Sequence, residues 1–331
     1  MCELECVDLA KLLEVKNLTT AFKTDNGYAK AVNDISFDVE KGSIVGLVGE
    51  SGSGKSVSSY SIMGLLPKHN SRIESGEILF EGKDLLKCSP KEMAKIRGKD
   101  ISMIFQEPMT SLNPVYTVES QIAEVFYNHT GLRKSEIKAK ILELLNRVGM
   151  QRAEEVMKVY PHQLSGGMRQ RVMIALAIAL KPKILIADEP TTALDVTIQA
   201  QILQLIKKLS IEDQMSVIFI SHNLGVISNI CEKVIVMYSS QIVEMTDTRT
   251  LYYQPKHPYT KSLISCIPQI GMSGQKLNQI EGTVPHPNDK IEGCRFKARC
   301  SYAMDICENE PEMRVSSDND GHFYRCFRED A

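Results

Sequence analysis

The chain has 331 residues, of which 43% are hydrophobic, and its 39 lysines and arginines nearly balance 41 aspartates and glutamates, giving a net charge of −2. This hydrophobic fraction is ordinary for a globular protein and excludes a disordered chain. The balanced charge gives no indication of nucleic-acid binding, which usually requires a basic surface. The length predicts one large domain with an additional segment, because a single core stops growing at about 250–300 residues.

The sequence contains no visible membrane span or secretory signal. Its longest apolar candidate, residues 173–180, is much shorter than the roughly 20 residues that a helix needs to cross a bilayer. Residues 1–15 carry acids and two cysteines in place of a basic start and an apolar run. We therefore expect a cytosolic protein, in which the nine cysteines are free thiols or metal ligands and not disulfides.

The order of the strand and helix patterns along the sequence predicts an α/β core. Antiparallel strands are expected between residues 12 and 45, followed by a buried strand at 43–48. Apolar residues three to four positions apart predict helices between about residues 108 and 161. Buried strands return at 184–187 and 217–220, with a helix at 198–209 between them, which predicts parallel strands. After about Glu244 the alternation fades, and we place a domain boundary there.

A glycine-rich turn follows the predicted strand at 43–48. Residues 49–56 read Gly-Glu-Ser-Gly-Ser-Gly-Lys-Ser and fit G-x-x-x-x-G-K-[ST], and an apolar helical segment follows at 57–66. In such a loop the glycines let backbone N–H groups turn towards phosphates. Lys55 is expected to meet the β- and γ-phosphates, and Ser56 to ligate Mg²⁺. The structural alternative, a surface loop of glycine and serine, fits the strand, loop and helix order less well.

Two further motifs could complete a site for phosphate chemistry. The strand at 184–187 ends in Asp188 and Glu189, where α/β sheets place ligand-facing groups. We expect Asp188 to hold Mg²⁺ through its water shell and Glu189 to orient or deprotonate the attacking water. Residues 164–171, Leu-Ser-Gly-Gly-Met-Arg-Gln-Arg, precede an apolar helix, with Ser165 as its N-cap. The structural alternatives are a polar turn and an ordinary capped helix.

Together these patterns resemble the nucleotide-binding subunit of an ABC transporter, over about residues 12–245. The resemblance rests on residues 49–56, Gln106, 164–171, 184–189, 193–195 and 221–222. It implies a P-loop ABC ATPase core of the α/β class, with a mixed sheet, an antiparallel β subdomain and a helical subdomain at about 107–165. It also implies ATP and Mg²⁺ as cofactors, and a head-to-tail dimer that sandwiches ATP between one subunit's phosphate loop and the other's Ser-Gly-Gly motif.

The resemblance assigns roles to matching residues of this chain. The implied ATP-binding residues are Gly49, Ser51, Gly52, Ser53, Gly54, Lys55, Ser56 and Asp188, with Ser165, Gly166, Gly167 and Asp195 directed to the partner's nucleotide or the dimer interface. The implied catalytic residues are Glu189, His222 and Gln106, and Gln106 joins Ser56 and Asp188 at the Mg²⁺ site. In isolation, Gln106, His222 and Asp195 would be read as a surface side chain, a loop histidine and a helix cap.

The family also stacks adenine on an aromatic ring of the early antiparallel sheet. Phe22 and Tyr28 both lie in that region. We favour Phe22 because of its position after Thr19-Thr20-Ala21. Either ring could instead be packed sheet surface.

Longer matches resemble the ATPases of oligopeptide and dipeptide permeases, a family that includes nickel importers. They are residues 105–114, 160–168, 187–201 and 257–260. Met168 fits this branch, whereas Asn223 replaces the usual Asp. The resemblance implies an ATPase on the cytoplasmic face of the membrane that powers peptide import through two integral membrane permease subunits, with an extracytoplasmic substrate-binding protein as an indirect partner.

A second, related ATPase subunit is the expected partner, giving a heterodimer rather than a homodimer. Two alternatives to peptide import stay open. The same subunit could serve nickel or another small solute, because the ATPase does not normally touch cargo. A soluble ABC ATPase acting on nucleic acid or ribosomes is disfavoured by the net charge of −2.

Four cysteines, at 294, 300, 307 and 326, cluster near the end of the chain. Four thiols can complete a zinc site or an iron–sulfur cluster, or can be unrelated free thiols, and their spacing lacks the C-x₂-C pairs of zinc ribbons. The segment is similar to the permease-ATPase extension that carries a [4Fe–4S] cluster in some members. We therefore expect Cys294, Cys300, Cys307 and Cys326 to bind a cluster, with zinc as the alternative. The predicted domains are an ABC ATPase at 1–245 and an oligopeptide-permease-type extension at 246–331.

Overall fold

The computed structural model describes residues 11–25, 27–106, 111–192, 194–267, 279–286, 289 and 291–328. Cys2, Cys6, Ala193 and residues 107–110 of the 105–114 match lie outside the described residues.

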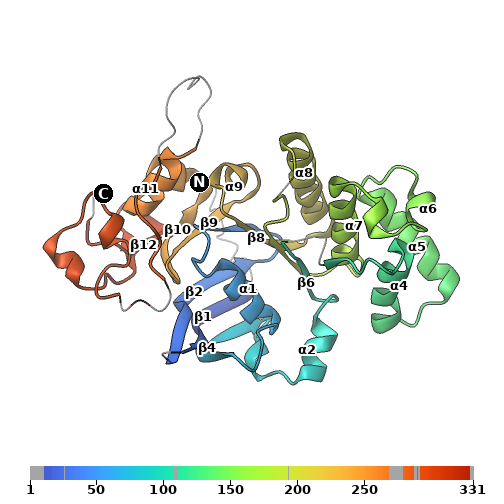
Figure 1. Ribbon diagram of the computed structural model, residues 1–331, viewed down its shortest axis with the longest axis horizontal. Helices are drawn as coiled ribbons and strands as arrows, with labels where there is room; N and C mark the ends of the chain where they lie inside the picture. The colour runs from blue at the N-terminus through green and yellow to red at the C-terminus, as the bar shows by residue number, and fades with distance from the viewer. Residues whose placement is uncertain are drawn as a thin grey trace, which may run out of the picture.

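Two sheets form the centre of the molecule, with the smaller one below the larger one in Figure 1. The smaller sheet is antiparallel, in the order β2-β1-β4-β5. Its strands are β1 (Lys11–Thr24), β2 (Gly27–Glu40), β4 (Ser71–Phe80) and β5 (Lys83–Asp84). The antiparallel strands predicted after residue 12 are therefore confirmed.

The larger sheet has the order β11-β12-β10-β9-β3-β8-β7-β6 within the described residues. Its strands are β3 (Ile44–Val48), β6 (Ile101–Ile104), β7 (Ile184–Asp188), β8 (Ser216–Ser221), β9 (Lys233–Tyr238), β10 (Gln241–Asp247), β11 (Arg314–Ser316) and β12 (Asn319–Tyr324). The five strands from β9 to β6 are parallel, and the remaining pairings are antiparallel. The parallel strands predicted at 184–187 and 217–220 are confirmed, whereas β6 and β9 were not predicted.

Helices surround this sheet and add a lobe at one end of the molecule. They are α1 (Lys55–Met63), α2 (Pro90–Ile96), α4 (Val118–His129), α5 (Lys134–Arg147), α6 (Ala153–Val156), α7 (Gly166–Ile178), α8 (Val196–Asp213), α9 (Leu224–Ile230), α10 (Thr248–Tyr253) and α11 (Pro258–Ser265). Helices α4, α5 and α6 lie beside α7, at the end opposite the C-terminal segment (Figure 1). The predicted helical layer is present there.

The large sheet is apolar on both faces because each face is covered. In β8, Val217 and Phe219 pack with the helices, whereas Ile218 and Ile220 pack with the antiparallel sheet. This alternation follows from the two-residue period of a strand. It explains why the buried strands read as continuous apolar runs in the sequence.

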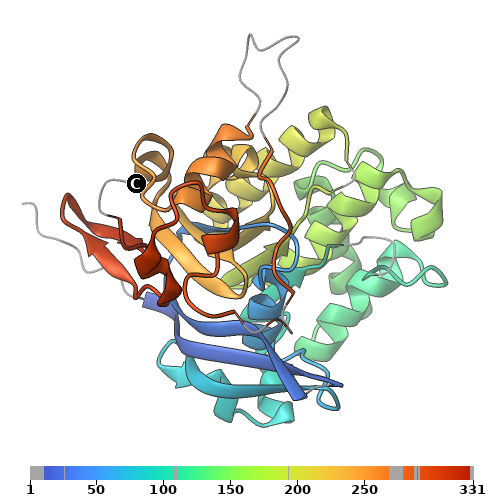
Figure 2. The same ribbon diagram turned by 60° about the vertical axis from the view of Figure 1, so that its left-hand side comes forward.

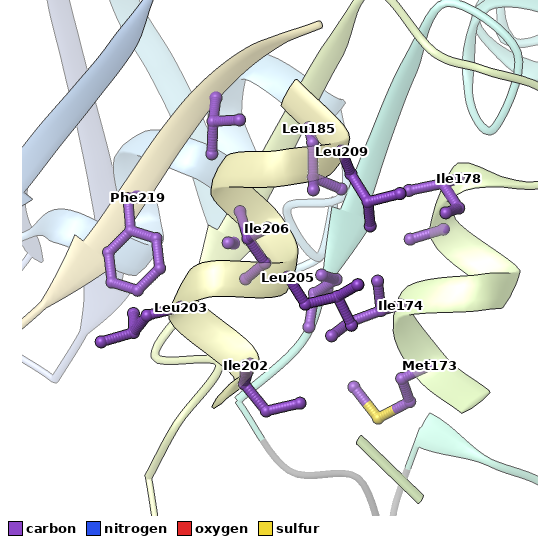
Figure 3. Packing of buried hydrophobic residues seen from close by; sticks show 14 of the residues in the cluster. Met173, Ile174, Ile178, Leu185, Ile202, Leu203, Leu205, Ile206, Leu209 and Phe219 are labelled. Carbon is purple, nitrogen blue, oxygen red and sulfur yellow. The ribbon is translucent and has the colours of Figure 1, made fainter. Parts of the chain in front are cut away.

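Helix α8 covers one face of the sheet with a stripe of apolar side chains. Ile202, Leu205, Ile206 and Leu209 follow a spacing of three to four residues, which places them on one side of a helix. Figure 3 shows them between the strand that carries Leu185 and the side chains of α7. The helix predicted at 198–209 is therefore confirmed, and its bounds are wider.

The segment after β10 joins the core through the sheet and an aromatic cluster. Strand β12 pairs with β10, and β11 pairs with β12, so the tail extends the large sheet (Figure 2). The ring of Phe296 lies 5.2 Å from that of Tyr238 and 5.4 Å from that of Tyr259. The tail therefore shares a core with the preceding part of the chain, and the domain boundary near 245 stays a prediction.

Along the part of the chain that is described, no helix combines the length and the apolar character needed to cross a membrane.

Replacing Ile206 with alanine should destabilise the fold, because Ile206 is fully buried between α8 and the sheet. We expect the free energy of unfolding to fall by about 3 kcal/mol, from lost transfer free energy and the cavity left behind. The matched control is Ile211→Ala on the same helix, where the side chain is 69% exposed. That variant should stay within about 0.5 kcal/mol of the parent in urea unfolding. Equal losses for both variants would contradict the packing described.

Candidate functional site

The order of the parallel strands brings three predicted motifs to one edge of the sheet. Strand β8 pairs with β3 on one side and with β7 on the other. Because the carboxyl ends of parallel strands meet at the same edge, Gly49 after β3, Asp188 at the end of β7 and His222 after β8 are neighbours. Ser56 Oγ donates a hydrogen bond to Asp188 Oδ1 at 3.2 Å, which joins the first two motifs directly.

Two glycines of the 49–56 loop are required by close backbone contacts. A Cβ on Gly49 would lie 2.1 Å from the carbonyl oxygen of Met237, and one on Gly54 would lie 2.5 Å from that of Ala31. Gly54 also has a φ of 104° at the N-cap of α1, a conformation that favours glycine. The first N–H groups of α1 therefore face the loop, where a helix N-terminus favours an anion.

Lys55 places its ammonium group within this loop. Its Nζ donates to the carbonyl oxygens of Gly49 and Glu50, both at 2.8 Å, and lies 3.3 Å from Ser53 Oγ. The residue is only 5% exposed, and this burial lowers its pKa, opposed by the nearby carboxylates, of which Glu189 contributes most. A largely desolvated cation at a helix N-terminus suits a phosphate chain.

Asp188 has a free oxygen suited to a cation. The residue is fully buried, and burial raises its pKa, opposed by the hydrogen bond from Ser56 and the charge of Lys55. Its Oδ2 is buried and has no hydrogen-bond partner. Buried polar atoms are usually satisfied, so this oxygen is a candidate ligand position. With the Ser56 hydroxyl it forms the oxygen donor set that Mg²⁺ prefers.

Glu189 is held by three side chains. His222 Nδ1 lies 3.1 Å from Oε1, whereas Thr192 Oγ1 and Gln106 Nε2 donate to Oε2 at 2.9 and 3.3 Å. Burial alone would raise the pKa of Glu189, but hydrogen bonds from His222 and Thr192 outweigh it and lower the pKa below its usual value. Glu189 is therefore a carboxylate at neutral pH. Thr192 was not predicted, although it lies three residues later in the same motif.

A cleft of about 410 Å³ opens beside the loop. Several residues that the sequence assigned to the ATP site line this cleft. They are Phe22, Ser51, Gly52, Gly54, Lys55, Ser56, Gln106 and Glu189. Its other lining residues, which the sequence did not indicate, are Thr24, Ala29, Ala31, Val57 and His286. Most of these residues have small or apolar side chains and lie outside the sequence motifs, so no sequence pattern gave a reason to select them. His286 comes from the C-terminal segment.

The two aromatic candidates differ in their surroundings. Phe22 lies on β1, pairs with Ala29 of β2 and lines the cleft. Tyr28 is 47% exposed, does not line this cleft, and carries the guanidinium of Arg72 3.7 Å from its ring centroid. Of the two candidate rings, Phe22 is therefore the one that lines the cleft.

The Ser-Gly-Gly motif and Asp195 form a second group at the N-termini of α7 and α8. Ser165 caps α7 by accepting from the Met168 N–H at 3.3 Å, as predicted, and Asp195 caps α8 by accepting from the Ile198 N–H at 2.9 Å. A Cβ on Gly167 would lie 3.0 Å from Ile198 Cγ2, so the two helix starts touch. None of Ser165, Gly166, Gly167 and Asp195 is among the described residues that line the cleft of their own chain.

The four clustered cysteines line one small cavity, together with His257 and Phe296. The Cys294 N–H donates to the Cys307 carbonyl at 2.9 Å, and a Cβ on Gly293 would lie 2.3 Å from the same oxygen. Burial raises the pKa of Cys294 to about 11, and the other three thiols add to the shift. Within the described residues, however, no group of three or more His, Cys, Asp or Glu side chains is arranged to hold a metal ion. The four cysteines that were predicted as metal ligands are therefore not arranged as a site for a single metal ion in the part of the chain that the structure describes.

The cysteines outside this cavity are more widely dispersed. Cys88, Cys231 and Cys266 are free thiols in the structure.

Comparison with known proteins places this geometry in a family. The family model described as "ABC transporter" matches residues 32–192, and the model "Oligopeptide/dipeptide transporter, C-terminal region" matches residues 243–307. The oligopeptide transport ATP-binding protein AppD of Bacillus subtilis is 50% identical, over 96% of this chain and 97% of that protein. The dipeptide transport ATP-binding protein DppD of Escherichia coli is 46% identical, over 93% of this chain and 94% of that protein.

Among solved structures, the dimeric bacterial ABC transporter cassette MJ0796 is 29% identical, with a TM-score of 0.64, over 72% of this chain and 99% of that chain. A structure of the same cassette in a post-hydrolysis state with ADP and Pi matches equally well. The predicted P-loop ABC ATPase fold is thereby confirmed. The chain therefore belongs to the ABC transporter family, in the group of ATP-binding proteins of oligopeptide and dipeptide transporters.

Proposed function

We propose that this chain hydrolyses ATP to power the import of peptides through partner membrane subunits. The observation that carries the proposal is the contact set around Glu189. An ionised carboxylate held by His222, Thr192 and Gln106 lies beside a phosphate-type loop and at the wall of a cleft. This combination suits the hydrolysis of a bound nucleoside triphosphate.

In this proposal, the 49–56 loop binds the phosphates through backbone N–H groups and Lys55. Ser56 and Asp188 would hold Mg²⁺, with Gln106 nearby, and the free Oδ2 of Asp188 supports this assignment. The ion would supply charge neutralisation at the β- and γ-phosphate oxygens. Phe22 would stack on adenine, because its ring lines the cleft.

Glu189 would orient the attacking water. A carboxylate with a lowered pKa is a weak base, so positioning the water is its stronger contribution. His222 would contact the γ-phosphate while it holds the other side of Glu189, at 3.1 Å. Most of the rate then comes from geometry and charge, as is usual for phosphoryl transfer.

Ser165, Gly166 and Gly167 would act on the nucleotide of a second ATPase chain, and Asp195 would lie at that interface. Their position away from their own cleft supports a head-to-tail dimer. A helix N-terminus with free N–H groups suits the γ-phosphate of a partner's ATP. We propose a related ATPase subunit as the partner, which gives a heterodimer.

The cargo and membrane partners are proposed from the relatives. Several are named as oligopeptide or dipeptide transport proteins. We therefore propose a peripheral subunit on the cytoplasmic face, bound to two integral membrane subunits, with an extracytoplasmic binding protein that delivers peptide. Nickel or another small solute is the alternative cargo.

The tail is proposed to bind a [4Fe–4S] cluster through Cys294, Cys300, Cys307 and Cys326. The four thiols line one cavity, which supports a shared ligand. A cluster is preferred to zinc because the segment is similar to the permease-ATPase extension, which carries a [4Fe–4S] cluster in some members. When bound, the cluster would supply a structural link and one-electron chemistry.

Replacing Glu189 with glutamine should nearly abolish ATP hydrolysis, because the neutral side chain loses the charge that orients the water. We expect a fall in kcat of about 100-fold or more, with ATP binding retained. Steady-state hydrolysis and calorimetric binding of ATP measure the two effects separately. Glu154→Gln, at an exposed position of α6, is the matched control and should hydrolyse ATP like the parent. Undiminished turnover in Glu189→Gln would refute the role of this residue.

Replacing Phe22 with alanine should weaken ATP binding about 10-fold, since stacking of a base on an aromatic ring contributes about 1–3 kcal/mol. Tyr28→Ala is the matched control, because Tyr28 lies on the neighbouring strand and contacts Arg72 instead. It should bind ATP within about twofold of the parent if it makes no stacking contact. A larger loss for Tyr28→Ala than for Phe22→Ala would assign adenine to the other ring.

Anaerobically purified protein should contain about four irons and four labile sulfides per chain if the cluster proposal holds. Cys300→Ser should lose most of this iron, because Cys300 lines the cavity. Cys266→Ser is the matched control, since Cys266 is a free thiol outside the cavity. Stoichiometric zinc without sulfide, or iron that is equally retained in both variants, would contradict the proposal.

A further inference from the structure

Arg299, the residue before Cys300, reaches from the cysteine-rich tail to the 49–56 loop. Its Nη1 donates to Glu50 Oε2 at 2.6 Å, and its Nη2 donates to Glu50 Oε1 at 3.0 Å. The Arg299 side chain is 5% exposed, so this two-point ion pair is largely shielded from water. Such paired contacts fix geometry as well as charge.

The backbone of Glu50 is held from the same direction. Its N–H donates to Tyr259 Oη at 2.9 Å. Tyr259 is fully buried on α11, and its ring packs against Phe296 of the tail. Both the side chain and the backbone of one loop residue are therefore fixed by segments that follow β10.

The same guanidinium holds a third segment of the chain. Arg299 Nε donates to the carbonyl oxygen of Glu281 at 2.9 Å, and Nη2 donates to that of Ile280 at 3.2 Å. His286, a few residues further along, lines the nucleotide cleft. Arg299 thus connects the cysteine loop, the phosphate loop and one wall of the cleft.

The charge of Glu50 gives this connection a consequence for ATP. A carboxylate in a loop that binds phosphates repels them unless a cation neutralises it. Lys55 Nζ donates to the backbone carbonyl oxygen of Glu50 at 2.8 Å, whereas the Glu50 carboxylate is contacted by Arg299. Arg299 contributes the missing positive charge at both carboxylate oxygens.

We propose that Arg299 is a positioning residue through which the cysteine-rich tail sets the affinity of the chain for ATP. It acts through Glu50, by neutralising the charge of the Glu50 carboxylate beside the bound phosphates. The inference rests on the proposed role of residues 49–56 as the phosphate loop. It adds a contribution from the tail, outside the residues 32–192 that match the ABC transporter model.

The test is the dissociation constant of MgATP, measured by calorimetry on the full chain and six variants. Arg299→Gln should weaken binding about 10-fold or more, as expected for the loss of charge-assisted hydrogen bonds. Adding Glu50→Gln to this variant should restore the affinity to within about threefold of the parent, since the repelling carboxylate is then removed. Glu50→Gln alone should also bind within about threefold.

Arg295→Gln is the matched control. Arg295 lies in the same loop and donates to the Ser239 carbonyl at 2.6 Å, without contact to Glu50. It should leave ATP affinity unchanged even if thermal stability falls. Arg299→Lys keeps the positive charge but loses the two-point contact with the Glu50 carboxylate, and should bind MgATP about threefold more weakly than the parent. This variant decides the question if Arg299→Gln does not fold.

Two results would overturn the inference. One is unchanged affinity in Arg299→Gln, or in Arg299→Lys where the glutamine variant does not fold. The other is a double variant as weak as Arg299→Gln, because a purely structural role gives no rescue. Lys55→Ala separates this inference from the proposed site. If Lys55→Ala retains parental affinity, the phosphate-loop assignment fails; if Lys55→Ala weakens binding but Arg299→Gln does not, only the coupling fails.

Discussion

The site depends on the parallel pairing of β3, β8 and β7. This pairing places the ends of three strands at one edge of the sheet and brings Gly49, Asp188 and His222 together from distant parts of the sequence. The apolar side chains on both faces hold these strands in register. Small polar residues at the strand ends can therefore keep fixed positions. The hydrogen bond between Ser56 and Asp188 is one result of that constraint.

The C-terminal segment is part of the same constraint. Its strands continue the large sheet, and the ring of Phe296 packs against Tyr238 and Tyr259. Through Arg299 it contacts Glu50 in the loop that follows β3. The tail is therefore well placed to influence nucleotide binding, although the sequence alone suggested a separate extension. Shared packing of this kind makes the behaviour of one segment depend on the other.

The sequence predicted the features that have a local signal. Turn chemistry indicates the phosphate-type loop at 49–56, and hydrophobic periodicity indicates the apolar strands and helix α8. The structure contains all of these features. Thr192 and His286 were missed because one is an unremarkable residue inside a motif and the other reaches the cleft only through tertiary packing. The pairing of Arg299 with Glu50 joins residues 249 positions apart, so no local spacing could indicate it.

The central claim is that ATP hydrolysis requires two chains, because the cleft and the Ser-Gly-Gly motif of one chain are separate. The most direct measurement is site-directed cross-linking in the purified transporter with bound ATP, using a photoreactive group at position 165. The account predicts a cross-link from Ser165 to the phosphate loop of the second ATPase chain, dependent on ATP. A cross-link from Ser165 to the phosphate loop of its own chain would contradict it.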